Sequence, residues 1–188
     1  MPWIHNVRST DVVCAVDDEQ CLALLRLFNE PEGACFLAGE GVEVPLLAQL
    51  PLLGISGLCN LVAAIKAARM FEMDSRDVVF TVLTDSMDLY RSRLQEQRQE
   101  HGAYSGPAAA RAFARWLEGI VTDHVRELTY ADRKVLHNFK YFTWVEQQGR
   151  SAEDLRRLWD PDFWAESYAQ ADEWDRSIEE FNARTGLM

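Results

Sequence analysis

The residues with the clearest chemical potential form a short turn, Gly54-Ile55-Ser56-Gly57, that leads into a helical pattern. We expect Ser56 or Asn60 to cap this helix, because a short polar side chain satisfies the free N–H groups of a first turn. Such a turn can bind an anion or a polar ring atom. The alternative is an ordinary capped helix whose glycines only make the turn. The apolar face recurs at steps of three and four residues: Leu58, Leu61, Val62, Ile65 and Ala68.

A second polar group, Thr84-Asp85-Ser86, directly follows the apolar run Val78–Leu83. The run is typical of a strand that is covered on both faces of a sheet. Ligands of open parallel sheets bind just beyond the carboxyl ends of the strands, which makes Thr84 and Asp85 candidate binding residues. In the other interpretation Asp85 or Ser86 only caps the next helix. Position alone does not decide between the two.

The elements that must position these residues are two strands and several helices. Val12–Val16 is a second β-branched run, and an acidic pair then starts a helix that ends at Asn29–Gly33. From Met87 onward the pattern is helical. The order predicts an α/β fold, in which a partial parallel sheet with flanking helices is followed by a mainly helical C-terminal extension.

Composition restricts the partners of the chain. It has 188 residues, of which 48% are hydrophobic, enough for one domain with a sizeable core. Its 30 acidic and 19 basic side chains give a net charge of -11, which repels nucleic acids and anionic membranes. No apolar run approaches the ~20 residues that span a bilayer, and the N-terminus lacks the profile of a signal peptide. We therefore expect a cytoplasmic protein without nucleic-acid or membrane partners.

The cysteines and histidines do not indicate a metal site. None of the four cysteines forms a C-x-x-C pair, and no two of the four histidines are spaced as H-x-x-x-H. Each cysteine lies among apolar residues, which favours buried free thiols over zinc ligands or disulfides. The turn at Ser56 is also not the G-x-S-x-G turn of a serine hydrolase.

Three motifs in order resemble the C-terminal part of the cysteine synthase family, the fold-type II pyridoxal phosphate enzymes. Val13–Phe28 with Glu32-Gly33 resembles the family's strand, acidic turn, helix and E-G sequence. Gly54–Gly57 resembles its G-I-S-S-G-A turn, and Thr81–Ser86 with Tyr90 resembles its strand ending in P-D-S-x-x-x-Y. The resemblance covers Val12–Leu94, so we divide the chain into residues 1–94, the family portion, and residues 95–188, a helical extension that packs on it or on a partner.

The resemblance implies roles for the turn and for the residues after the strand. In the family the serine of the turn hydrogen-bonds the pyridine nitrogen of the cofactor, and Ser56 matches it, with Gly54 and Gly57 beside it. A neutral partner keeps that nitrogen largely unprotonated and favours β-elimination or β-replacement. Thr84 and Asp85 are second candidates for cofactor contact. The chain departs from the pattern at Gly57 and Leu58, which replace Ser and Ala, and at Thr84, which replaces Pro.

The family's Schiff-base lysine and phosphate-binding loop have no match here. Lys66, Lys134 and Lys140 are the only lysines, and none has the expected context. Because the reaction requires that lysine, we expect a partial enzyme, a fragment of the lyase and transferase type in amino-acid metabolism, that is inactive alone. The pyridoxal phosphate site then needs a missing N-terminal half or a partner subunit. The alternative is a non-catalytic interaction module derived from the same fold.

The predicted partial enzyme also implies association. An isolated half-domain exposes apolar surface where its other half packs, so we expect it to associate with itself, as a homo-oligomer, or with another chain. Aromatic residues of the C-terminal tail are a further candidate for such contacts: Trp159, Phe163, Trp164, Tyr168, Trp174 and Phe181.

Overall fold

The computed structural model describes residues 4–186, which divide into two compact units. The central unit is Val12–Arg126, and the terminal unit combines residues 4–11 with residues 127–186. This division follows contacts within the chain. The predicted boundary at residue 94 marks how far a family resemblance extends, and it stays a prediction.

Helix α1 (Asp18–Asn29) is the centre of the central unit, because it packs against α2, α4, α5 and α6. Asp17 caps it, with its carboxylate accepting from Glu19 N at 2.8 Å. The other elements of the unit are α2 (Pro31–Gly39), α3 (Val44–Leu47), η2 (Leu50–Leu52), α4 (Ile55–Met70), η3 (Met87–Tyr90), α5 (Arg91–His101), α6 (Gly106–Phe113) and the π-helical turn η4 (Ala114–Glu118).

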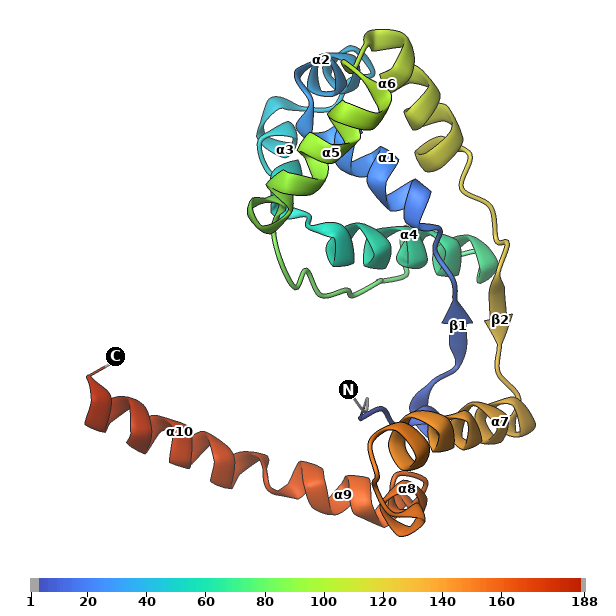
Figure 1. The fold of residues 1–188 in the computed structure, drawn as a ribbon, viewed down its shortest axis with the longest axis vertical. Helices are drawn as coiled ribbons and strands as arrows, with labels where there is room; N and C mark the ends of the chain where they lie inside the picture. Colours follow the sequence, from blue (N-terminus) through green and yellow to red (C-terminus); the bar gives the residue numbers. More distant parts are fainter. Residues whose placement is uncertain (1–3, 187–188) are drawn as a thin grey trace. The chain divides into compact units, whose positions relative to one another are not determined.

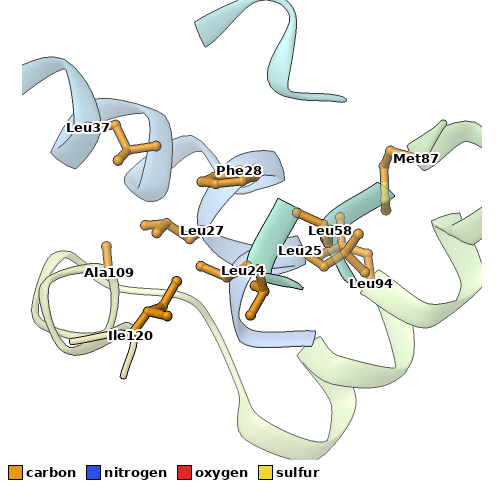
Figure 2. Packing of buried hydrophobic residues seen from close by; sticks show 11 residues of the cluster. Leu24, Leu25, Leu27, Phe28, Leu37, Leu58, Met87, Leu94, Ala109 and Ile120 are labelled. Atoms are coloured by element: carbon orange, nitrogen blue, oxygen red, sulfur yellow. The ribbon is translucent and has the colours of Figure 1, made fainter. Parts of the chain in front are cut away.

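The core of this unit is a cluster of eleven buried apolar side chains, drawn in Figure 2. Four come from α1 on more than one side of the helix, as expected for an element that is covered by neighbours all round. α2, α4, α5 and α6 each add at least one. The members are Leu24, Leu25, Leu27, Phe28, Leu37, Leu58, Val62, Met87, Leu94, Ala109 and Ile120.

The predicted α/β fold with a partial parallel sheet is wrong. The chain is mostly helical, and its described residues contain only a two-stranded antiparallel sheet of β1 (Val12–Cys14) and β2 (Val125–Glu127). Val78–Leu83 forms no strand and runs as exposed coil along α4 (Figure 1). A strand requires a neighbour for its backbone N–H and C=O groups, and the described residues place none beside this run.

The terminal unit is built from η1 (Val7–Ser9), α7 (Tyr130–Tyr141), the π-helical turn η5 (Phe142–Gln147), α8 (Ala152–Arg157), α9 (Pro161–Ala169) and α10 (Ala171–Thr185). Capping boxes start α7 at Thr129 and α8 at Ser151. Its small core contains Trp144, Leu155 and Leu158. α10 has no buried residue.

A buried histidine makes the stability of the terminal unit sensitive to pH. Burial, and then the charges of Lys140 and Lys134, lower the pKa of His137 from its ordinary value. Between that lowered value and 6.5 the unfolded chain binds the proton that the folded chain resists, so unfolding becomes easier as pH falls through this window. Burial and Lys140 lower the pKa of His5 in the same direction.

We expect the free energy of unfolding, measured with urea and tryptophan fluorescence, to be lower at about pH 5.5 than at about pH 7.5. His137→Gln is expected to flatten this pH dependence, and His101→Gln, at an exposed position of the central unit, serves as control. An unchanged slope in the His137 variant would contradict the assignment.

Candidate functional site

The Gly-Ser turn and the residues after the apolar run lie together in the central unit. The Gly54 N–H donates to the Asp85 carbonyl at 3.0 Å. A Cβ on Gly54 would lie 2.3 Å from Asp85 Oδ1 and 2.8 Å from Tyr90 Cε2. Gly54 is therefore required for close approach, and not for an unusual backbone angle, since its φ is -75°. We call Gly54, Ser56, Asp85 and Tyr90 the turn cluster.

Asp85 and Tyr90 are joined by a hydrogen bond in which the phenol donates to Oδ2. The other carboxylate oxygen, Oδ1, is buried and has no hydrogen-bond partner among the described residues. The bond to Asp85 is the main cause of the raised pKa of Tyr90, whereas hydrogen bonding with Ser56 acts in the opposite direction. The Ser56 side chain therefore lies near Tyr90.

Ser56 itself is exposed, in the first turn of α4. The predicted capping role is wrong: the N-cap is Gly54 and no side chain bonds to the first-turn N–H groups. The Ser56 hydroxyl and the first-turn N–H groups therefore share one end of a 16-residue helix, where the helix dipole favours negative charge and hydrogen-bond acceptors.

Asn60 ties the apolar run to α4. Its side-chain amide donates to the Val82 carbonyl at 2.9 Å, and with the Gly54–Asp85 bond it holds Val82–Asp85 along the first turns of the helix. Gly57 is buried, but a Cβ there would make ordinary contacts with Leu53 and Leu83. Ser86 caps η3 by accepting from Asp88 N at 3.3 Å.

The structure thus brings Gly54, Ser56, Gly57 and Asp85 into one place. Thr84 is exposed and adjacent through the chain. Tyr90 contacts Asp85, and Asn60 contacts the backbone just before it, although the sequence predicts neither as a binding residue. The spacing Asp-Ser-x-x-x-Tyr carried the signal for Tyr90, and only the fold reveals the role of Asn60.

The three lysines are engaged in other contacts. Lys66 is buried, donates to the Ala15 and Asp123 carbonyls, and forms a 2.9 Å ion pair with Asp123. Lys140 donates to the His5 carbonyl at 2.5 Å, and burial lowers its pKa to about 8. The ammonium of Lys134 lies 4.2 Å from the centre of the Trp159 ring.

Other kinds of site have weaker support in the described residues. The four cysteines are free; Cys21 is buried and Cys35 is exposed, so the expectation of buried thiols holds only in part. Residues 4–186 contain no group of three or more His, Cys, Asp or Glu side chains that could hold a metal ion. In the same range no single helix is long and apolar enough to cross a membrane, and one pair, Val44–Leu52 with Ile55–Met70, qualifies only when joined across a 117° bend.

Comparison with known proteins identifies no relative: no protein-family model, no curated protein and no solved structure matches the chain.

Proposed function

We propose that the chain is the C-terminal portion of a pyridoxal phosphate-dependent amino-acid enzyme of the β-elimination or β-replacement type, similar to cysteine synthase. In this proposal it supplies one side of the cofactor site and is inactive alone, in the cytoplasm. The observation that carries the proposal is the turn cluster. The two motifs on which the family resemblance depends are linked through the Gly54–Asp85 hydrogen bond, beside an exposed Ser56 hydroxyl.

The residues present fit one edge of a pyridine ring. Ser56 offers a neutral hydroxyl that can donate to a ring nitrogen, and Gly57 adds no side chain beside it. Asp85 accepts from Tyr90 through Oδ2, and its Oδ1 is buried. The exposed Ser56 hydroxyl is therefore the more available partner for the ring nitrogen. Pyridoxal phosphate, when bound, supplies the electron sink for bond cleavage next to the amino group. A neutral donor at its nitrogen moderates that sink.

The remainder of the site requires another polypeptide. The ammonium group of each lysine already contacts another part of this chain: a backbone carbonyl, a carboxylate or an aromatic ring. The run Val78–Leu83 supports a missing half, because its apolar side chains are exposed and it belongs to no helix or strand of the described chain. Val78 and Phe80 are both 88% exposed. We infer that this run adds to the edge of a sheet in the partner.

The test pairs the chain with an N-terminal half of a cysteine synthase-like enzyme that contains the Schiff-base lysine and phosphate loop. Pyridoxal phosphate is added to each part and to the mixture, followed by borohydride reduction and peptide mass spectrometry. We expect co-purification, and a reduced adduct on the partner's lysine only. In the complex, Ser56→Ala should weaken cofactor binding roughly 3- to 10-fold, as for one lost hydrogen bond.

Two controls make the test specific. Ser75→Ala removes an exposed hydroxyl outside the turn cluster and should leave cofactor binding unchanged. Phe80→Lys alters an exposed side chain, so the chain should fold but lose the partner half. A single adduct on Lys66, Lys134 or Lys140 in the chain alone would contradict the proposal, because the chain would then hold the cofactor by itself.

The second candidate function is a non-catalytic interaction module. It is favoured by α10, where Trp174, Ile178 and Phe181 recur on one face at helical spacing and are each more than half exposed. Such a stripe is typical of a helix that packs on a partner protein. If a partner half binds through α10 and binds no cofactor with the chain, this second function replaces the first.

A further inference from the structure

We propose that the cavity between α1, α5 and α6 of the central unit binds a small organic anion that carries a carboxylate or a phosphate. The cavity measures about 910 Å³, which lies within the ~300–1,000 Å³ range of small-molecule sites. It is separate from the turn cluster, since none of its lining residues belongs to that cluster. The inference therefore does not depend on the proposed function.

Two residues that line this cavity, Arg26 and Tyr104, each carry a buried hydrogen-bond donor without an acceptor among the described residues. The Arg26 side chain is 7% exposed, and its NH2 group donates to the Gly102 carbonyl at 2.8 Å, yet its Nε has no partner among the described residues. The Tyr104 hydroxyl is likewise buried and unpartnered. The guanidinium carbon of Arg26 lies 4.8 Å from the centre of the Tyr104 ring, which places both groups at one part of the wall.

The Tyr104 hydroxyl retains its proton at neutral pH. An arginine side chain is always charged in proteins. Burial, as the main cause, raises the pKa of Tyr104 to about 12, so its hydroxyl can still donate. Buried donors without partners are unfavourable until an acceptor arrives. A carboxylate or phosphate oxygen is an acceptor that either donor can use.

The charge around the cavity also favours an anion. Arg26 and Arg98 both pair with the buried carboxylate of Glu30, and Glu32 also acts on Arg98. Arg111 and Arg115 line the cavity nearer to solvent. Glu19 and Glu100 also line it and offset two of the positive charges. Among the lining side chains, three arginines exceed two glutamates in a chain whose net charge is -11, and local charges dominate at short range because salt screens distant ones.

The remaining wall is suited to the carbon skeleton of a ligand. Leu22, Ala108, Ala112 and Trp116 provide apolar surface, and the Arg115 guanidinium covers the Trp116 ring at 4.2 Å. This combination of apolar wall and buried donors is typical of sites for organic molecules, and it offers less to a bare inorganic ion.

The experiment is calorimetric titration of the full chain at constant ionic strength. Citrate tests the carboxylate source and adenosine monophosphate the phosphate source, while inorganic phosphate and neutral adenosine serve as matched probes. Pyridoxal phosphate is left out, so that failure here is distinguishable from failure of the proposed function. We expect saturable binding of citrate or adenosine monophosphate, and at least tenfold weaker binding of adenosine.

Variants locate the bound anion. Tyr104→Phe removes only the unpartnered hydroxyl and is expected to weaken binding several-fold while the fold is retained. The double variant Arg111→Gln with Arg115→Gln, at exposed positions, should weaken it at least tenfold. Arg93→Gln, on the exposed face of α5, should leave it unchanged. Absence of saturable binding by both organic anions, or equal affinity in the cavity variants and the wild type, would overturn the proposal.

Discussion

Gly33→Ala is expected to destabilise the central unit by roughly 3 kcal/mol or more, because overpacking against rigid backbone cannot relax locally. Gly33 is buried in the first turn of α2, where that helix passes over the end of α1. A Cβ there would lie 2.0 Å from the Leu27 carbonyl oxygen and 2.8 Å from its carbon. Leu27 is fully buried in the core (Figure 2) and cannot move aside.

The matched control is Gly39→Ala at the other end of the same helix. No atom lies within 4 Å of a Cβ at Gly39, so alanine there should be neutral or stabilise by up to about 1 kcal/mol through helix propensity. Urea unfolding of both variants measures the difference. Equal stabilities of the two variants would show that α1 and α2 separate at little cost, contrary to the packing described.

Glu30→Gln is expected to cost roughly 3 kcal/mol of unfolding free energy, because it leaves a buried charge without its counter-ion. Glu30 is 5% exposed and joins α1 to α5. It accepts from Arg98 through both oxygens, at 2.9 to 3.1 Å, and from Arg26 at 3.4 Å. The neutral amide would leave the Arg26 guanidinium buried and uncompensated.

Arg98→Gln provides the comparison for this variant. The Arg98 side chain is 49% exposed, whereas that of Arg26 is 7% exposed. Removal of the Arg98 guanidinium keeps the Arg26–Glu30 pair, and solvent screens the interaction of Arg98, so we expect a smaller cost than for Glu30→Gln. Denaturant unfolding of both variants gives the ranking. If Arg98→Gln proves the more damaging change, burial of Arg26 is not the source of the effect.

The helices of the central unit were largely predictable because their signals are local. The three- and four-residue spacing from Leu58 to Ala68 predicted the helix that the structure shows as α4, and Asp17 begins α1 as an acidic start signal indicates. Of the predicted Gly-Ser turn only Gly54 precedes α4, as its N-cap, whereas Ile55, Ser56 and Gly57 already belong to the helix. The proximity of this turn to Asp85 followed from family resemblance, and not from periodicity.

The strands were the least predictable elements. An apolar β-branched run indicates a preference for extended backbone, but a sheet also requires a neighbour with free N–H and C=O groups. The described chain pairs Val12–Cys14 with Val125–Glu127 instead, across more than a hundred residues. The residue pattern indicates which segments prefer a strand conformation, but it does not identify their pairing partners, and the predicted parallel sheet required both.

Residues Asn29–Gly33 show the division between sequence and tertiary structure most clearly. By itself the sequence determined that α1 must end there, because proline at position 31 removes a backbone donor and breaks the helical ladder. Only the tertiary structure decided that Glu30 is a buried counter-ion for two arginines and that Gly33 touches the Leu27 backbone. Helix ends depend on neighbouring residues, whereas burial and charge pairing depend on segments that folding brings together from distant positions.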